Sequence, residues 1–260
     1  CNSLIKWEAL INFADEIRVD YIATGHYARI CNQNGTYTIQ KAVDEFKDQS
    51  YMLWDIEKKY LSKTIFPIGD MKKEEVRDYA LKHNLETAKR EESQDLCFVL
   101  GDDYNQFLHE IIPDKMASIS NGPIVDEKNN ILGEHKGFTK YTIGQRKGIG
   151  LSFPEPRYVK KINPVDNTIT VSKKESLYSK KCTAYNTNFF SETLKFPIKL
   201  DAKIRYNSKS SLATINKVKN ELEIDFETPQ LAITSGQSIV FYQDDLLIGG
   251  AIIKWQMILL

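Results

Sequence analysis

The chain has 260 residues, of which 42% are hydrophobic and 27% are charged, and its formal net charge is zero. This composition is typical of a soluble protein with two or three domains and excludes one that spans a membrane by helices, because no apolar run approaches the ~20 residues that a bilayer requires. The four cysteines form no Cys-x-x-Cys pair and the four histidines lack ligand spacing, so we expect no disulfide scaffold, no metal site, and free thiols in a reducing cytoplasm.

The chain opens with the pattern of an α/β unit. An amphipathic helix is predicted over residues 4–17 and a short apolar strand over residues 19–23, and this strand ends in Thr24-Gly25-His26. Ligands of open parallel sheets sit beyond the carboxyl ends of the strands. Gly25 and His26 are therefore placed where a ligand is expected.

A β-hairpin and a polar loop follow. Asn34-Gly35 is a strong hairpin signal before a strand predicted over residues 37–42. The polar run Lys47-Asp48-Gln49-Ser50 then leads into the apolar residues 51–56. Without further information this run is best interpreted as a solvated loop.

Two predicted helices flank the segment that contains Cys97. Asp70 is the expected N-cap of a helix that continues to about His83, and a second helix over residues 103–112 ends at Pro113. The stretch "EESQDLCFVLGD" places Cys97 after an acidic run and before an apolar patch. An unpaired cysteine is most often a small core residue, and the alternative is a nucleophile at a strand end.

From Gly122 onward the pattern changes to alternating apolar and polar residues with turn signals. Short strands at regular spacing predict a small antiparallel barrel. We expect a multidomain α/β plus β protein with an α/β domain over residues 1–100, a small central domain over 101–155 and the barrel over 156–260. The predicted strands lie at 123–132, 157–171, 199–205, 213–218, 222–226, 238–242 and 246–253.

The zero net charge hides an uneven distribution. Residues 136–220 hold 18 Lys and Arg against 5 Asp and Glu, whereas residues 1–135 hold 16 against 24. Basic residues interleaved with Tyr and Gly suit a nucleic-acid backbone, although such a block is often only a solvated surface. Composition alone leaves these two interpretations equally open.

The run "IGQRKGIG" at residues 143–150 resembles a phosphate loop only superficially. It lacks the Gly-Lys-Ser/Thr ending and has no clear buried strand before it, so a nucleotide triphosphate loop is rejected there. A basic loop that contacts a nucleic-acid backbone is the better interpretation.

Several short motifs in one order resemble the tRNA-specific 2-thiouridylases of the MnmA/TrmU family. The resemblance covers essentially the whole chain, and seven motifs in register make it specific although each is weak alone. The motifs are "CNSLIKWEAL", "DYIATGHYARI", "KDQSYMLW", "SQDLCF", "GEHKGFTKYTIGQRKGIG", "KIRY" and "SGQSIVFY…IGGAII".

The resemblance implies an enzyme that converts the C2 carbonyl of the tRNA wobble uridine into a thiocarbonyl. It implies the C-terminal part of a PP-loop, adenine nucleotide α-hydrolase-like domain, a central tRNA-contacting domain and a C-terminal β-barrel. The implied cofactors are ATP with Mg²⁺ and sulfur delivered as a persulfide. The implied partners are tRNA and a sulfur-donor protein, either a cysteine desulfurase or a sulfur relay protein, and no membrane.

The resemblance also implies roles for individual residues. Cys97 would hold the incoming sulfur as a persulfide, and Cys1 would resolve the link to the base and leave a Cys1–Cys97 disulfide. Such a bond requires Cα atoms within ~7 Å. Gly25 matches a nucleotide-contacting glycine. The positions that match tRNA contacts are His26, Lys47, Asp48, Gln49, Arg205, Tyr206 and Gln237.

One departure from the family pattern matters. The Ser-Gly-Gly-x-Asp-Ser loop that holds the ATP pyrophosphate is absent from this sequence, as is the Asn-Pro-Asp segment before the first cysteine. We therefore expect that the sequence begins inside a longer protein and that this chain alone does not thiolate efficiently. The alternatives are a non-catalytic tRNA-binding remnant and, with less support, a thiol-disulfide protein that uses Cys1 and Cys97.

Overall fold

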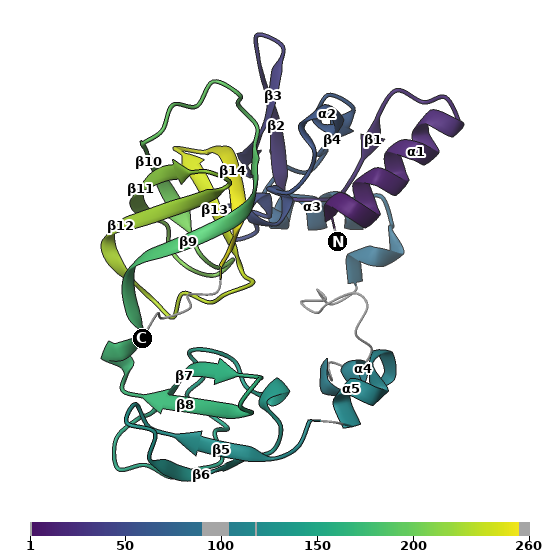
Figure 1. Cartoon of the computed structure of the whole chain (residues 1–260). Helices are drawn as coiled ribbons and strands as arrows, with labels where there is room; N and C mark the ends of the chain where they lie inside the picture. The colour runs from purple at the N-terminus through teal and green to yellow at the C-terminus, as the bar shows by residue number, and fades with distance from the viewer. Residues whose placement is uncertain (1, 90–103, 118, 255–260) are drawn as a thin grey trace. The chain divides into compact units, whose positions relative to one another are not determined.

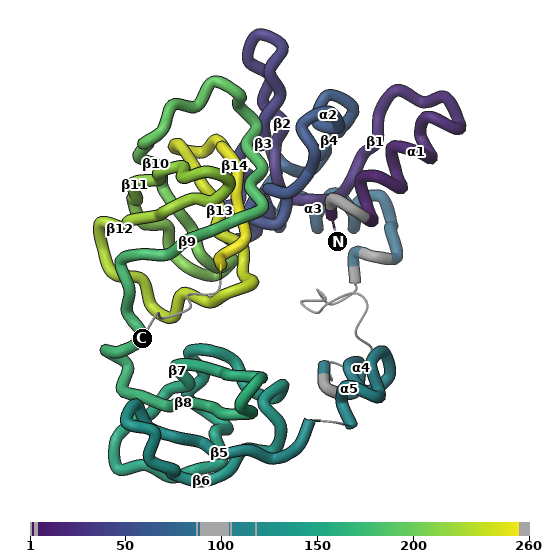
Figure 2. Tube along the Cα trace, in the orientation of Figure 1, coloured from purple at the N-terminus to yellow at the C-terminus, as the bar shows by residue number. Residues whose placement is uncertain are grey.

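The computed structural model describes residues 2–89, 104–117 and 119–254. The chain divides into two compact units (Figures 1 and 2). The first consists of Cys1–Arg90, Lys180–Thr228 and Thr234–Leu260, and the second of Glu91–Ser179 and Pro229–Ile233. In the described part of the chain, no helix is long and apolar enough to cross a membrane.

The first unit begins with the predicted helix and strand. A π-helical segment, η1 (Asn2–Trp7), runs into α1 (Glu8–Glu16), and β1 (Ile22–Ala23) pairs in parallel with β4 (Thr64–Ile65). The indole N–H of Trp7 donates a 2.9 Å hydrogen bond to Thr64 Oγ1, which fastens the start of the helix to this small sheet. The other helices of this region are η2 (Ser50–Leu53), α2 (Lys58–Leu61), α3 (Lys73–Lys82) and η3 (Glu86–Lys89).

Helix α3 has a different N-cap from the one predicted. The N-cap is Lys72, whose backbone N–H donates a 2.7 Å hydrogen bond to the Glu75 carboxylate. A carboxylate at the third helical position satisfies a donor at the helix start and here outweighs the Asp70 signal. Asp70 instead lies 3.8 Å from Arg29 as an ion pair. The predicted end is confirmed, because His83 is the C-cap.

The predicted hairpin is present as β2 (Ala28–Gln33) and β3 (Thr36–Lys41). Asn34 and Gly35 have φ of 52° and 84°. A two-residue turn of this type needs positive φ at both central positions, which Asn and Gly tolerate best. The sequence signal therefore predicted the turn correctly, and the strand after it begins one residue earlier than predicted.

The C-terminal part of the first unit is a closed antiparallel β-barrel (Figure 1), which confirms the predicted fold class. The strands follow the order β13-β10-β11-β12-β9-β14, and β14 pairs with β13 to close the barrel. Strand β9 was not predicted, because its buried positions are the small residues Cys182 and Ala184 in a polar sequence. The bounds are β9 (Tyr178–Phe189), β10 (Ile198–Lys203), β11 (Ser211–Val218), β12 (Glu221–Leu231), β13 (Ser238–Gln243) and β14 (Leu246–Ile253).

Strand β14 joins the N-terminal hairpin to the barrel. Its first residues pair with β3, with Leu247 opposite Ile39, and its later residues pair with β9, with Gly249 opposite Phe189. Ile39, Leu247 and Trp54 belong to one cluster of buried residues. The hairpin, the segment around Trp54 and the barrel therefore share a single hydrophobic core.

Among its described residues, the second unit contains two α-helices, two short 3-10 helices and a four-stranded sheet of order β6-β5-β8-β7. The hairpin at residues 157–171, expected in the barrel, pairs here instead, with Ile124 of β5 opposite Ile169 of β8. The alternation of apolar and polar residues predicted the strands of this hairpin, but it did not predict their pairing with β5. Pro113 begins a further helix after the first one ends. The elements are α4 (Tyr104–Ile111), α5 (Pro113–Ala117), β5 (Gly122–Val125), β6 (Ile131–His135), η5 (Phe138–Lys140), β7 (Tyr158–Asn163), β8 (Thr168–Ser172) and η6 (Lys174–Leu177).

Gly250 on β14 lies directly against the Trp54 ring, and we predict that Gly250→Ala destabilises the first unit. A Cβ at residue 250 would lie 2.6 Å from Trp54 Cδ2. The ring has little freedom to move, because it is buried and its N–H donates a 2.9 Å hydrogen bond to Ser238 Oγ. The free energy of unfolding in urea should fall by about 1–3 kcal/mol.

Gly25→Ala is the matched control for this substitution. A Cβ at Gly25 meets no heavy atom within 4 Å. Its free energy of unfolding should stay within about 0.5 kcal/mol of the wild-type value. Equal stability of the two variants would show that the contact between Gly250 and Trp54 does not constrain the fold.

Candidate functional site

The structure describes eight of the ten predicted site residues. Cys1 and Cys97 lie outside the described residues. The others all belong to the first unit. They lie after β1, in the loop before η2, after β10 and before β13: Gly25, His26, Lys47, Asp48, Gln49, Arg205, Tyr206 and Gln237.

His26 is held in an aromatic environment at the end of β1. Its Nδ1 lies 2.9 Å from Thr24 Oγ1, and its ring centroid lies 5.4 Å from that of Trp7 and 6.1 Å from that of Phe66. Burial, assisted by the Lys6 ammonium, lowers the pKa of His26 to about 4. The imidazole is therefore neutral at neutral pH and suited to stacking or hydrogen bonding rather than to ion pairing.

Neither the backbone conformation nor the packing of the protein requires a glycine at residue 25. Its φ lies outside the left-handed region, and an added Cβ would meet open space. The backbone is therefore accessible to a ligand at this point, which fits the nucleotide contact that the resemblance implies. Among the described residues, no group of three or more His, Cys, Asp or Glu side chains is arranged to hold a metal ion.

Asp48 and Gln49 hold the loop at residues 47–49 in shape. Asp48 Oδ1 accepts a 3.0 Å hydrogen bond from the Ala42 N–H, and its Oδ2 accepts one of 2.8 Å from the Ser50 hydroxyl. Gln49 Oε1 accepts a 3.0 Å hydrogen bond from the Tyr27 N–H, and the Gln49 N–H donates one of 2.8 Å to the Tyr27 carbonyl. Both side chains thus bind the protein's own backbone.

The residues that follow this loop are bonded to barrel strand β13. Ser50 is fully buried, and its Oγ lies 3.0 Å from the Tyr242 hydroxyl. The Tyr51 hydroxyl donates a 2.8 Å hydrogen bond to the Ser238 carbonyl, and the Trp54 N–H donates to the Ser238 hydroxyl. The predicted loop is therefore positioned by the barrel.

Arg205 and Tyr206 lie in the turn after β10, not in a strand as predicted, because β10 ends at Lys203. The Arg205 guanidinium donates a 2.8 Å hydrogen bond to Thr234 Oγ1. The Tyr206 ring centroid lies 6.1 Å from that of Tyr51. The turn therefore contacts the segment that follows the loop at residues 47–49.

Gln237 completes this arrangement from the barrel side. It is exposed, its N–H donates to the Thr234 carbonyl at 3.3 Å, and its carbonyl accepts a 2.8 Å hydrogen bond from the Ile253 N–H. It directly precedes Ser238, the partner of Tyr51. Three predicted segments that are far apart in the sequence are thus brought to one region of the first unit.

Lys203 belongs to this region but was not predicted. Its Nζ lies 5.8 Å from the ring centroid of Tyr51 and 5.5 Å from that of Tyr206. The available signal was its place in the motif "KIRY", two residues before Arg205. Tyr51 was missed because its apolar neighbours suggested only a core segment.

The raised pKa values of two tyrosines limit the kind of chemistry that this region can offer. Burial raises the pKa of Tyr51 to about 12, and burial also raises the pKa of Tyr242 above its usual range. Neither hydroxyl ionises near neutral pH. These two groups therefore offer hydrogen bonds and aromatic surface rather than acid–base chemistry.

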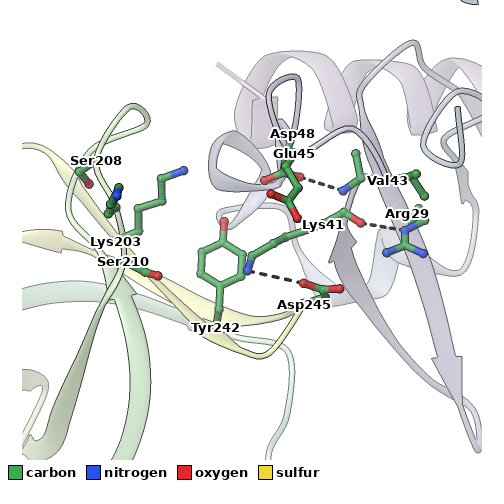
Figure 3. A pocket seen from close by; sticks show the side chains of 12 residues that line it. Arg29, Lys41, Val43, Glu45, Asp48, Lys203, Ser208, Ser210, Tyr242 and Asp245 are labelled. Atoms are coloured by element: carbon green, nitrogen blue, oxygen red, sulfur yellow. Dashed lines mark hydrogen bonds and ion pairs between the residues drawn. The ribbon is translucent and has the colours of Figure 1, made fainter. Parts of the chain in front are cut away.

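A pocket of about 660 Å³ lies between the loop at residues 41–48 and the turn at residues 203–210 (Figure 3). The hydroxyl of Tyr242 points toward Asp48 in this view, and Lys203 extends into the opening from the barrel side. The wall combines four cationic with three anionic side chains. Its shape and charge suit a polar, charged ligand.

The two described cysteines, Cys31 and Cys182, are both unpaired. Cys182 is buried in β9, and burial raises the pKa of its thiol to about 12. A thiol with such a pKa is hardly ionised at neutral pH and is a poor nucleophile. Cys31 lies half-buried on β2 and is also unpaired.

Three sequence-family models match consecutive parts of the chain. Residues 1–101 match a tRNA methyl transferase HUP domain, and residues 105–173 match a tRNA methyl transferase PRC-barrel domain. Residues 179–253 match an aminomethyltransferase β-barrel domain. The third match includes all of β10 to β14.

Curated relatives match almost the whole chain. A tRNA-specific 2-thiouridylase MnmA of Clostridium acetobutylicum is 41% identical over 98% of this chain and 71% of its own length. One of Clostridioides difficile is 42% identical over 98% and 71%, and one of Natranaerobius thermophilus is 43% identical over 97% and 69%. The chain thus spans about 70% of the length of these relatives.

The lowered pKa of His26 predicts a pH dependence of stability. Between pH 6.5 and 4 the unfolded chain binds a proton at residue 26 that the folded chain does not bind, so the free energy of unfolding should fall as the pH falls through this window. The full difference corresponds to about 3 kcal/mol, and partial solvent exposure reduces it to about 2 kcal/mol.

The measurement is urea unfolding followed by tryptophan fluorescence at several pH values. His26→Gln should remove this part of the pH dependence, and His109→Gln, at an exposed position, should keep it. A wild-type slope that persists in His26→Gln would show that His26 titrates normally in the fold.

Proposed function

The chain belongs to the family of tRNA-specific 2-thiouridylases, and from this premise we propose that it acts in the 2-thiolation of the wobble uridine of tRNA. Relatives that are 41–43% identical to it have this name. The family-model descriptions name methyl transfer instead. Thiolation is favoured because Cys1 and Cys97 occupy motifs that resemble those of the thiouridylases.

The observation that best supports a tRNA-binding role is the convergence of the predicted tRNA contacts. The loop at residues 47–49, the turn with Arg205 and Tyr206, and Gln237 meet around Tyr51. A cationic, aromatic and hydroxyl-rich surface contacts phosphate and sugar without reading bases. Such a surface holds the tRNA body while the target uridine is presented elsewhere.

In the proposed reaction two cysteines divide the sulfur chemistry. A sulfur-donor protein converts the Cys97 thiol into a persulfide, and the terminal sulfur attacks C2 of the uridine while the activated oxygen leaves. The Cys1 thiolate then attacks the Cys97 sulfur, which releases 2-thiouridine and forms a Cys1–Cys97 disulfide. A thiol reductant supplies the two electrons that regenerate both thiols.

ATP, with Mg²⁺, would activate the C2 oxygen as a leaving group. In this chain Gly25 would lie against the nucleotide, because open space adjoins its backbone. The neutral imidazole of His26 would stack or donate a hydrogen bond beside it without adding charge. In this proposal both residues therefore orient a ligand, and neither transfers a proton in the reaction.

A non-catalytic tRNA-binding remnant is the second candidate. The observation that favours it is that the predicted tRNA contacts at residues 47–49, Arg205 and Gln237 meet in the first unit, because this surface can bind tRNA without any sulfur chemistry. The two candidates differ in turnover but not in tRNA binding. Both are proposed for the cytoplasm, where tRNA and reduced thiols occur together.

We predict that Cys97→Ser abolishes sulfur transfer while leaving tRNA binding unchanged, because Cys97 is the proposed sulfur carrier. A cysteine desulfurase first loads the protein with sulfur, and mass spectrometry locates the persulfide. The amount of 2-thiouridine in digested tRNA is then measured. Cys182→Ser is the control, since Cys182 is buried with a raised pKa. Persulfide mainly on Cys31 or Cys182 would contradict the assignment, and tRNA binding without any turnover would favour the remnant.

We also predict that Arg205→Ala weakens the binding of substrate and non-substrate tRNA alike by about fivefold, because one phosphate contact is lost. The salt slope, which is the slope of log affinity against log salt concentration, should fall by about one. Thr234→Val is the control, since it removes the hydroxyl that accepts the Arg205 hydrogen bond but keeps the charge. It should change binding less than about twofold. Equal weakening by both variants would give Arg205 a structural role, and a loss confined to substrate tRNA would make it a specificity residue.

A further inference from the structure

We propose that Lys203 is the anchoring cation of a phosphate-binding pocket that holds one backbone phosphate of tRNA. This inference rests on the proposed function and adds a binding site to it. The pocket is the one between the loop at residues 41–48 and the turn at residues 203–210, about 660 Å³ in volume (Figure 3). The argument depends on which of its charged groups are already bound by the protein.

Two of the cations that line the pocket are satisfied internally. The Arg29 Nε–H donates a 2.7 Å hydrogen bond to the Lys41 carbonyl. The Lys41 ammonium donates a 2.9 Å hydrogen bond to the Asp244 carbonyl and lies 3.7 Å from the Asp245 carboxylate. Figure 3 marks the ion pair between Lys41 and Asp245. Both cations are thus already bound to groups of the protein that stabilise the wall of the pocket.

Lys203 differs from these two cations. Within the described residues its ammonium makes no hydrogen bond and no ion pair, and its close contacts are the rings of Tyr51 and Tyr206. Burial lowers the pKa of Lys203, while Asp48 favours its charged form and Lys41 opposes it. A half-buried ammonium whose three donors are unused is the group that gains most from an anionic ligand.

The two tyrosine rings make Lys203 a prepared site. Contact with the negative faces of aromatic rings holds a cation in place without neutralising it. Less side-chain entropy is then lost when a ligand binds than for a freely moving surface lysine. The rings come from η2 and from the turn after β10, so the folded junction itself creates the site.

The groups around Lys203 suit a phosphate group as the ligand. Lys209 and Ser210 line the same pocket and, among the described residues, have no hydrogen-bond or ion-pair partner. The exposed carboxylate of Glu45 also lines the pocket and would repel an anionic ligand. Its removal therefore tests whether the ligand is negatively charged. Because Arg205 and Gln237, the proposed tRNA contacts, lie in the same region, the phosphate is assigned to the RNA backbone rather than to a free nucleotide.

The test compares Lys203→Met with Lys217→Met in tRNA binding at several salt concentrations. Methionine keeps the apolar stem of Lys203 against the tyrosines and removes its charge. Lys217 is an exposed lysine on β11 with no partner among the described residues, so its variant loses the same charge. Lys203→Met should weaken substrate and non-substrate tRNA about fivefold to tenfold and lower the salt slope by about one, whereas Lys217→Met should change binding less than about twofold.

A second measurement requires no variant of Lys203. Chemical acetylation of the wild-type protein, read by mass spectrometry, should be slowed at Lys203 but not at Lys217 when tRNA is present, and millimolar AMP or inorganic phosphate should give no protection. Glu45→Gln should tighten tRNA binding about twofold, because it removes a repulsive charge.

The outcomes separate this inference from the proposed function. If the wild-type protein binds no tRNA, the proposed function fails and the phosphate pocket fails with it. If the wild-type protein binds tRNA but Lys203→Met behaves like Lys217→Met and Lys203 is not protected, only the pocket is overturned. Protection by AMP equal to that by tRNA would make the pocket a free-nucleotide site and would also overturn the inference.

Discussion

The buried hydrogen bonds between residues 50–54 and strand β13 position the proposed binding loop at residues 47–49 against the barrel. The fully buried Ser50 hydroxyl is bonded both to Asp48 and to the Tyr242 hydroxyl. A buried polar group left without its partner costs about 1–3 kcal/mol, so these groups hold one another in a single geometry. These bonds therefore fix the loop before Ser50 to the barrel.

Strand β14 makes this junction possible by pairing with three other strands. Its start extends the hairpin β2–β3, its remainder pairs with β9, and β13 lies along its other edge. Gly250 leaves room for the Trp54 ring at the same place, since any side chain there would overlap it. The parts of two different family matches that belong to the first unit, residues 2–89 and residues 180–228 with 234–253, are therefore one packed body rather than two linked domains.

Local sequence signals predicted the elements better than their partners. The Asn34-Gly35 turn and most barrel strands were correct because turn chemistry and alternation act over a few residues. The hairpin at residues 157–171 was assigned to the wrong sheet, since pairing such as Ile124 with Ile169 spans a distance that periodicity does not report. The site shows the same limit. The resemblance supplied the loop at residues 47–49, but only the structure shows that Asp48 and Gln49 bind the protein's own backbone.

The surroundings of Lys203 combine residues from both regions of the first unit. The cation–π contacts of Lys203 require Tyr51 from the region of the HUP-domain match and Tyr206 from the region of the barrel match. A barrel alone would keep its lysines but lose Tyr51 and the Asp48 carboxylate that favours the charged form of Lys203. A basic composition would then remain without a prepared site, and its affinity would rest on screened surface charge. The proposed binding surface is therefore a property of the junction between the two regions, and only a polypeptide that contains both can form it.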